Sequence, residues 1–501
     1  MSDKSNFLSL FTLAIGGYVL LILGHGYVFG HLGTMETFPY VKKLLDPTLY
    51  PHDFYIDGIQ SHFPDVRWIF VQMLKILGIH SGWTAFIAHF LVTLFLILGL
   101  LKVALIFTSN KTSAFLATMM TLLILYNHNL GGNELYYNNL APSLVAKSIG
   151  VWSVYWLLKK RIHRAILLLI PTTFIHPMVG VQLFLLETSA WWLASLQKTK
   201  NPFPWKAVVL YVLTSGAWII FLQRSFSDST VASAKIFEIL EFRLGHHYFP
   251  ADYPLKDYGL LVPYFLFGWW FLGKQNRLIF WFYAVVALGL VVYSVGVELA
   301  QIPAILSAQW FKTTIWLKFF SSIALFVFIE KKLLSKVDFL RKLYTPMTGF
   351  VFVGLGIFLF LKLPQRQPTT LDLPWRGAYN DRIKMALFAK AKTPKDALFI
   401  TPSDFTHLKY YGERSTYVDY KATIHFRSKL VEWYHRIHDI YRQTTSANNS
   451  NTRLIQHHFA PSPKQIKHFK TLGITHIITT SQLDHNEKFI GKIGDYWLYA
   501  L

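Results

Sequence analysis

The chain of 501 residues contains no cysteine, so disulfide bonds, thiolate metal sites and cysteine catalysis are excluded. Hydrophobic residues make up 53% of it and aromatic residues 17%, enough apolar material for a large membrane core beside a small soluble domain. Much of its formal net charge of +22 at pH 7 is attributed to basic residues that flank membrane spans on the cytoplasmic side, so we predict no nucleic-acid partner.

Uncharged apolar runs recur from Phe7 to Leu361. An α-helix needs about 20 apolar residues to cross a bilayer, so these runs predict a polytopic membrane protein with about eleven transmembrane helices. The expected spans are 7–28, 83–101, 113–127, 142–158, 164–176, 178–197, 206–222, 257–273, 277–296, 307–329 and 345–362. We interpret the first as a retained span, because no small-residue cleavage site follows it.

Basic residues between the runs predict the orientation of the chain. They gather in alternate loops, whereas the loops at 128–141 and 297–306 contain no Lys or Arg. By the positive-inside bias, the N-terminus is expected in the cytoplasm and the C-terminal residues outside. A single helix over 164–197 would be about 50 Å long, so we expect two short spans that meet at His176-Pro177.

Two outer loops are expected to be long, at residues 29–82 and 223–256. In the first, apolar residues between Asp65 and Ile79 repeat at helical spacing. This pattern predicts an amphipathic helix that lies in the membrane interface. These two loops are where polar residues gather outside the apolar runs, so we expect functional groups there.

The composition changes after residue 363, where apolar runs give way to alternating helix and strand patterns. Helices are expected at 381–391 and 426–441 and after Ser462-Pro463, and strands at 397–401, 415–419, 474–479, 489–493 and 496–501. The alternation predicts a small α/β domain, residues 364–501, on the outer face. It would follow a transmembrane domain formed by residues 1–363.

Four residues of the membrane half are candidates for catalysis or for a pocket. Glu36 and Asp53 could act as a general base, because a carboxylate can take a proton near neutral pH. Capping and turn formation are the alternative for both. His176 lies at the expected helix break, and Lys147 interrupts an apolar span. A charge within a helical bundle suggests function, although a lysine can also extend toward the interface.

The second long loop ends in a cluster of basic and acidic residues. Arg243, His246 and His247 are candidates for holding a phosphate group through charge-assisted hydrogen bonds. Asp252 lies five positions after His247 and is a further candidate for a pocket residue. His246, His247 and Asp252 could also ligate a divalent cation, although adjacent histidines point apart in an extended chain. A divalent cation is thus one alternative at these residues, and no other cofactor is predicted.

Several segments resemble one family. They are His25-Gly-Tyr-Val-Phe-Gly30, Leu45-Asp-Pro-Thr-Leu-Tyr-Pro-His-Asp53, Phe242-Arg-Leu-Gly-His-His-Tyr-Phe-Pro250, Thr393-Pro-Lys-Asp-Ala-Leu-Phe-Ile-Thr-Pro402 and Val418-Asp-Tyr-Lys421. Together with the layout, which covers nearly the entire chain, they resemble the GT-C superfamily of membrane glycosyltransferases, and more closely a bacterial branch of it. The Trp-Trp-Asp-Tyr-Gly signature of oligosaccharyltransferases is absent, which argues against N-glycosylation.

The resemblance implies transfer of a sugar from a polyprenyl-phosphate donor to a glycan or lipid acceptor, on the outer face of a bacterial inner membrane. An acidic residue of the first outer loop would serve as base. One alternative is a non-catalytic envelope-assembly protein that binds lipid-linked glycans. A transporter is a further alternative, but the chain lacks the internal repeat that many transporters show.

Overall fold

The computed structural model describes residues 2–196, 203–226, 231–333, 338–362, 371–441, 459–483 and 487–501. About 70% of the chain is helical. The residues form two compact units. Unit 1 comprises Met1–Gly26, Ala88–Ile219 and Leu244–Gln367, and unit 2 comprises Tyr27–Ile87, Ile220–Arg243 and Pro368–Leu501. Unit 2 therefore combines most of the first long loop with the C-terminal residues, and the predicted domain boundary at residue 363 stays a prediction.

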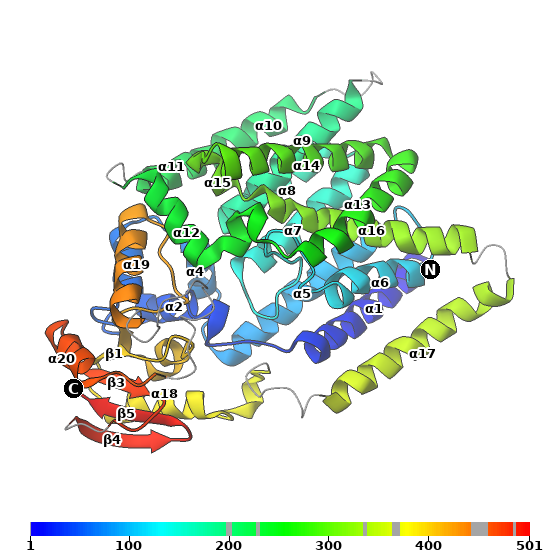
Figure 1. Ribbon diagram of the computed structural model, residues 1–501. Helices are drawn as coiled ribbons and strands as arrows, with labels where there is room; N and C mark the ends of the chain where they lie inside the picture. Colours follow the sequence, from blue (N-terminus) through cyan, green and yellow to red (C-terminus); the bar gives the residue numbers. More distant parts are fainter. Residues whose placement is uncertain are drawn as a thin grey trace. The chain divides into compact units, whose positions relative to one another are not determined.

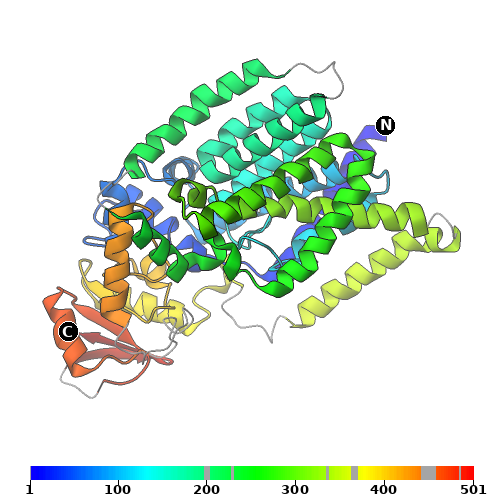
Figure 2. The same cartoon turned by 45° about the horizontal axis from the view of Figure 1, so that its top comes forward.

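Among the described residues, the regular elements of unit 1 are helical, and loops and short 3₁₀ or π turns connect its α-helices. They are α1 (Ser2–His25), α5 (Gly82–Ala104), α6 (Lys111–Met119), α7 (Pro142–Leu158), α8 (Ile162–Ile175), α9 (Pro177–Ser195), α10 (Trp205–Tyr211), α11 (Ala217–Phe226), α12 (Ser233–Tyr248), α13 (Leu255–Gln275), α14 (Arg277–Ser294), α15 (Pro303–Ala308), α16 (Thr314–Phe328) and α17 (Asp338–Lys362). Helices α5, α11 and α12 also contain residues of unit 2. Helices α7, α8 and α9 pack side by side, and α13 packs on α16 (Figure 1). Figure 2 shows the cyan helices side by side from a second direction.

Six helices among the described residues are long and apolar enough to cross a membrane. They are Phe7–His25, Gly82–Ala104, Trp205–Gln223, Arg277–Leu299, Pro303–Lys332 and Lys342–Leu361. Shorter apolar helices cover Lys111–Ile124 and Ile162–Ile175. These helices indicate a membrane-embedded protein, as predicted. The predicted count of about eleven spans is not confirmed, although helices α7, α9 and α13 lie at the three remaining positions.

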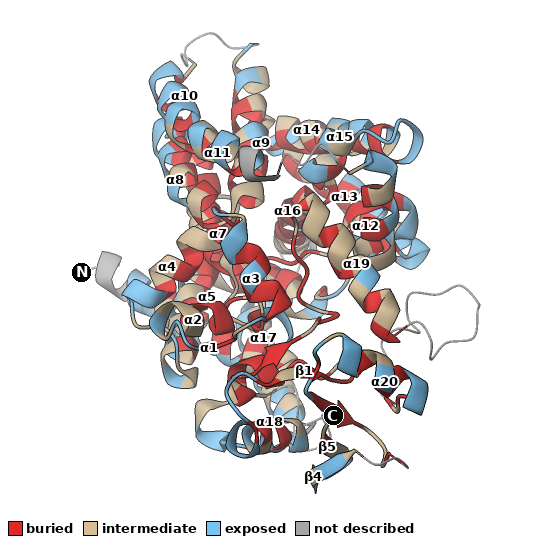
Figure 3. Ribbon diagram, turned by 90° about the vertical axis from the view of Figure 1, so that its left-hand side faces the viewer, coloured by how far each residue is buried: buried red, intermediate tan, exposed pale blue. Residues whose placement is uncertain are grey.

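Apolar side chains remain exposed on several of these helices. Trp205 is 67% exposed and Leu213 is also 67% exposed, and much of α10 is coloured as exposed in Figure 3. Large apolar surfaces of this kind are rare on soluble monomers. They are expected where a helix faces lipid, since lipid tails are as apolar as the side chains.

Unit 2 contains short helices from the first long loop and from the C-terminal residues, which also form a small sheet. The helices are α2 (Phe38–Leu45), α3 (Phe54–Ser61), α4 (Trp68–Ile76), α18 (Asp381–Lys392), α19 (Arg427–Tyr441) and α20 (Pro463–Thr471). The strands are β1 (Leu398–Ile400), β2 (Ser415–Thr416), β3 (His476–Thr479), β4 (Lys488–Ile493) and β5 (Tyr496–Ala500). Their order is β2-β1-β3-β5-β4, with β1 parallel to β2 and β3, and β5 antiparallel to β3 and β4.

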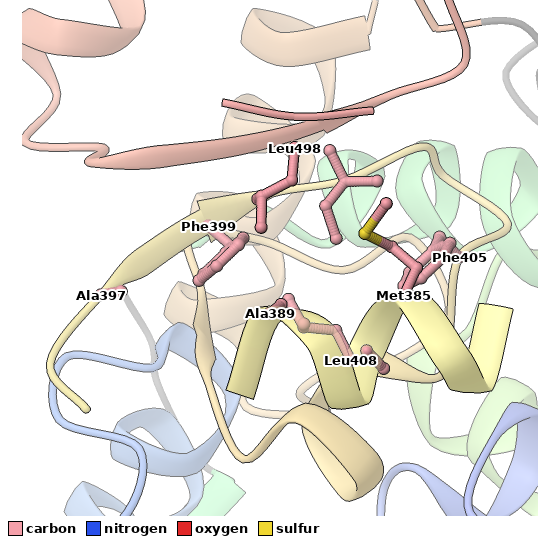
Figure 4. Close-up of a cluster of buried hydrophobic side chains, with 9 residues drawn as sticks. Met385, Ala389, Ala397, Phe399, Phe405, Leu408 and Leu498 are labelled. Carbon is pink, nitrogen blue, oxygen red and sulfur yellow. The ribbon is translucent and has the colours of Figure 1, made fainter. Parts of the chain in front are cut away.

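The core of the C-terminal region lies between α18 and the sheet. Met385 and Ala389 of α18 point toward Phe399 of β1 and Leu498 of β5 (Figure 4). All four side chains are buried. Each fully buried large side chain contributes about 1.5–3 kcal/mol of hydrophobic stabilisation. The alternating helix and strand pattern of the sequence thus folds into a small α/β sheet region.

Candidate functional site

A polar cavity of about 330 Å³ lies within unit 1. Its lining residues are Tyr126, Asn127, Asn129, Gly132, Glu134, Tyr137, His246, His247, Tyr253, Pro254 and Asp257. They come from the loop after α6, the end of α12 and the start of α13. Phenol, amide, imidazole and carboxylate groups therefore face one space, and none of these lining residues is Lys or Arg. We call this cavity the polar pocket.

A close backbone approach brings the α12 end against the loop after α6. Gly132 has φ +56°, a left-handed conformation that favours glycine. A Cβ atom at this position would lie 2.4 Å from Nδ1 of His247. His247 Nδ1 also lies 3.4 Å from the carbonyl oxygen of Gly131. Glycine at 132 therefore allows the imidazole to reach the wall of the polar pocket.

A buried ion pair fixes the loop that lines the polar pocket. Lys318 of α16 donates from Nζ to Oε2 of Glu134 at 2.6 Å and to the carbonyl oxygen of His128 at 3.0 Å. The other carboxylate oxygen of Glu134 accepts the backbone N–H of Asn127 at 2.9 Å and Nδ2 of Asn129 at 2.8 Å. Both oxygens are thus engaged. Glu134 holds the loop in place instead of offering a free base.

Lys147 reinforces the same loop. Its ammonium donates to Oδ1 of Asn133 at 2.6 Å and to the carbonyl oxygen of Glu134 at 2.5 Å. It also lies 4.6 Å from the centre of the Tyr137 ring, a cation–π distance. Lys147 is buried and is not a lining residue of the polar pocket. Lys147 is thus a buried charge in the helical unit, and its contacts hold the loop that lines the polar pocket.

Asp257 is the lining carboxylate that keeps an available oxygen. It lies in the first turn of α13 and is 4% exposed. Its Oδ1 lies 3.1 Å from Nδ1 of His128, whose side chain is 43% exposed. Among the described residues, no donor contacts the other oxygen. An ionised carboxylate can only accept, so Nδ1 of His128 is the donor when Asp257 is ionised.

Sequence reasoning missed Asp257 because the residue lies at the expected start of a span, where an acid is ordinary. Acidic residues are favoured in the first turn of any helix, since they offset its positive end. Its position in an expected membrane helix is the signal, because an ionisable residue there usually pairs with another polar group. Its partner, His128, is 129 positions away in the sequence.

The structure brings two predicted residues, His246 and His247, to the polar pocket. They follow Leu244, where α12 departs from helical geometry with φ −138° and ψ 29°. Their ring centroids lie 4.1 Å apart. Asp252 is not a lining residue, and a Cβ added to Gly245 would lie 2.0 Å from its Oδ2. Asp252 therefore packs against Gly245.

No described group of three or more His, Asp or Glu residues is arranged to hold a metal ion. The divalent cation considered for His246, His247 and Asp252 thus has no such cluster in the described chain.

His176 lies elsewhere in unit 1, between α8 and α9, as predicted. Its Nδ1 accepts the backbone N–H of Val179 at 3.4 Å, so it caps α9 at the helix break.

Asp53 belongs to unit 2, where it is fully buried in an ion cluster. Its Oδ1 accepts from Nζ of Lys409 at 2.8 Å and from the first turn of α3, which it caps. Its Oδ2 accepts the backbone N–H of Thr416 at 2.9 Å. Lys409 also pairs with Asp419 at 2.5 Å. We call Asp53, Lys409 and Asp419 the buried triad.

The two carboxylates of the buried triad favour the charged form of Lys409. Burial by itself would lower the pKa of Lys409, but the Asp419 and Asp53 carboxylates raise it above its ordinary value overall. Each oxygen of Asp53 already accepts hydrogen bonds, so the geometry favours the capping alternative for this residue. Its assignment as a general base stays a prediction.

Glu36 and Arg243 also lie in unit 2 and are engaged there. Glu36 pairs through Oε2 with Nη2 of Arg67 at 2.5 Å. Arg243 donates from Nε to the carbonyl oxygen of Tyr420 at 3.0 Å and from Nη2 to that of Lys421 at 3.3 Å. Its guanidinium lies 4.7 Å from the centre of the Tyr420 ring. Arg243 is therefore in a different unit from His246 and His247, its predicted partners in phosphate binding.

Comparison with models of protein families gives a match in the C-terminal region. Residues 380–440 match a family described as a domain of unknown function (DUF6798). The matched segment includes Lys409 and Asp419 of the buried triad. No curated protein matches the chain.

Proposed function

We propose that the protein is a membrane glycosyltransferase of the GT-C type. It would move a sugar from a polyprenyl-phosphate donor to an acceptor hydroxyl on the non-cytoplasmic side of a bacterial inner membrane. The observation that carries the proposal is the polar pocket, where carboxylate, imidazole, amide and phenol groups converge within an apolar helical unit. The segments that resemble the superfamily, and the layout of about eleven expected spans with an outer C-terminal region, support it further.

The reaction needs groups of the kinds that line the polar pocket. The acceptor oxygen attacks the anomeric carbon, and its proton passes to a base. The bond between the anomeric carbon and the phosphate oxygen breaks, and the electron pair leaves with the polyprenyl phosphate. A carboxylate can take the proton, and a base of this kind contributes about 10²–10⁴-fold in rate. Hydroxyl, amide and imidazole groups can fix the sugar by hydrogen bonds.

Product formation by the purified protein in lipid tests the proposal. The protein is supplied with labelled undecaprenyl-phosphate hexoses and with envelope lipid or glycan acceptors. We expect label to move from the polyprenyl phosphate to an acceptor. Donors that bind but are never consumed would contradict transfer.

A second candidate is a non-catalytic protein that binds lipid-linked glycans during envelope assembly. One observation favours it, because the acids of the first outer loop, Glu36 and Asp53, are both held in ion pairs. Saturable binding of sugar-bearing lipid without turnover would support this candidate. Sugar that crosses the bilayer of sealed proteoliposomes would instead indicate the transporter.

A further inference from the structure

The lining of the polar pocket fits an uncharged polyol. Tyr126, Tyr137 and Tyr253 supply aromatic rings, and Asn127 and Asn129 supply amides that can both donate and accept. A volume of about 330 Å³ falls in the range of about 300–1,000 Å³ that small-molecule pockets occupy. The hydroxyl groups and C–H faces of one sugar ring match these two kinds of surface.

The same lining is unsuited to a phosphate group. Its acidic members are Glu134, which is paired with Lys318, and Asp257, whose carboxylate would repel an anion, and none of its lining residues is Lys or Arg. Three lysines lie near this loop. Lys318 is engaged with Glu134 and Lys147 with Asn133, and Lys312, whose carbonyl oxygen accepts from Asn133, is not among the lining residues. A phosphate would therefore meet negative charge without a cation among the lining residues, whereas a sugar hydroxyl would meet acceptors.

Asp257 differs from Glu134 in what its oxygens can still do. Glu134 accepts three hydrogen bonds across its two oxygens from Lys318 and the loop. Asp257 has a single side-chain partner in the described chain, His128. One oxygen of Asp257 can therefore accept a hydrogen bond, or a proton, from a ligand in the polar pocket.

His128 is positioned by the contact that holds the loop. Lys318 donates to the His128 carbonyl oxygen at 3.0 Å, and Nδ1 of His128 lies 3.1 Å from Asp257. The residue before it, Asn127, adopts a left-handed conformation with φ +67°, which asparagine tolerates better than most residues. These contacts fix the backbone at His128, and the Nδ1 contact joins its imidazole to the Asp257 carboxylate.

We infer that the polar pocket is a subsite for an uncharged sugar, and that Asp257, positioned by His128, takes the proton from the acceptor hydroxyl. The catalytic part of this inference rests on the proposed transfer function. The acceptor O–H bond breaks as its oxygen bonds to the anomeric carbon, and the proton moves to the free oxygen of Asp257. The departing polyprenyl phosphate keeps the electron pair of the broken bond.

The test compares Asp257→Asn with a matched control, Glu298→Gln. Glu298 is an exposed acid of unit 1 that is not among the lining residues of the polar pocket. Binding to the protein in nanodiscs is measured for undecaprenyl phosphate carrying glucose, galactose or mannose, and for undecaprenyl phosphate alone. We expect Asp257→Asn to weaken binding of at least one sugar-bearing lipid while leaving the bare lipid unaffected. Turnover should fall by about 100-fold or more, and Glu298→Gln should retain both.

The outcomes separate this inference from the proposed function. If the wild type forms product and Asp257→Asn keeps full turnover and binding, the inference is wrong and the transfer function stands. If the wild type forms no product but only Asp257→Asn loses preference for sugar-bearing lipid, the sugar subsite stands and transfer is wrong. If the wild type binds bare and sugar-bearing lipid equally, the subsite is wrong.

His128 provides a second series in case Asp257→Asn does not fold. His128→Ala removes the N–H donor, whereas His128→Asn retains one near the position of Nδ1. A positioning role predicts a lower kcat at nearly constant KM for the alanine variant, with partial recovery in the asparagine variant. Equal kcat in the wild type and His128→Ala would overturn the positioning role.

Discussion

At the scale of single residues, partners decide what each charge can do. Asp53, Glu134 and Asp257 are all buried carboxylates. Asp53 and Glu134 have strong donors on both oxygens, whereas Asp257 has one partner in the described chain. Sequence alone cannot distinguish them, because each is simply an acid near an apolar segment. We therefore expect the first two to determine stability and the third to determine chemistry.

The buried triad should behave as a structural unit. Lys409→Met leaves the Asp53 and Asp419 carboxylates buried without their common cation, and breaking a buried pair in this way costs about 3–5 kcal/mol. Thermal or denaturant unfolding of the purified protein measures the loss. Lys395→Met is the control, because Lys395 pairs with Asp46 at an exposed site and should change stability little. A stable Asp53→Asn variant that has lost all turnover would restore Asp53 as the base.

A buried histidine predicts pH-dependent stability. His407 is buried, and its two ring nitrogens have no hydrogen-bond partner among the described residues. Burial lowers the pKa of His407 well below its ordinary value, and the nearby charges of His31 and Arg382 lower it further. The His31 ring stacks on it at 4.2 Å and is itself paired with Asp372 at 2.6 Å.

The sign of the effect follows from which state binds the proton. Below pH of about 6.5 the unfolded chain protonates this histidine while the folded chain does not. The stabilisation is therefore present above that pH and is lost progressively as the pH falls. The unfolding midpoint should drop between pH 7 and 5, and less so in His407→Phe. Parallel pH curves for the two proteins would contradict this assignment.

At the scale of elements, local chemistry made several boundaries predictable. Asn380 caps α18, and Ser462 caps α20 with Gln465 in a reciprocal capping box, as their side chains suggest. Pro177 begins α9 directly after the break at His176. Each signal lies within four residues of the boundary that it sets.

The contacts of the candidate site could not be predicted in this way. The Asp257–His128 contact joins residues 129 positions apart, and the Asp53–Lys409 pair joins residues 356 positions apart. No local periodicity encodes such contacts.

The glycine beside His247 offers a test of how the elements shape the polar pocket. Gly132→Ala places a methyl group 2.4 Å from Nδ1 of His247 and also strains a left-handed backbone. Gly473→Ala is the control for a positive φ, since Gly473 has φ +78° but open space around its Cβ position. Both variants should lose about 1–2 kcal/mol of stability from strain. Only Gly132→Ala should also weaken binding of sugar-bearing lipid, measured in nanodiscs; equal binding by the two variants would contradict the close approach.

At the scale of the whole molecule, the alternation of basic loops makes a prediction about topology. An odd number of crossings from a cytoplasmic N-terminus places residues 364–501 outside. A reporter that is active only outside the cytoplasm, fused after Leu501, should therefore be active. A reporter that works only in the cytoplasm should be silent at the same point. The opposite pair of results would overturn both the orientation and the proposed outer-face reaction.

The composition of unit 2 has a consequence for the order of biosynthesis. Asp53 emerges from the ribosome 356 residues before Lys409, which corresponds to roughly 20–70 s at about 5–20 residues per second. During that interval Lys409, the cation with which its carboxylate pairs in the folded chain, has not been synthesised. A nascent chain that stalls before Lys409 thus carries a first loop in which Asp53 lacks its cation. Assembly of the buried triad follows the synthesis of Lys409 and Asp419.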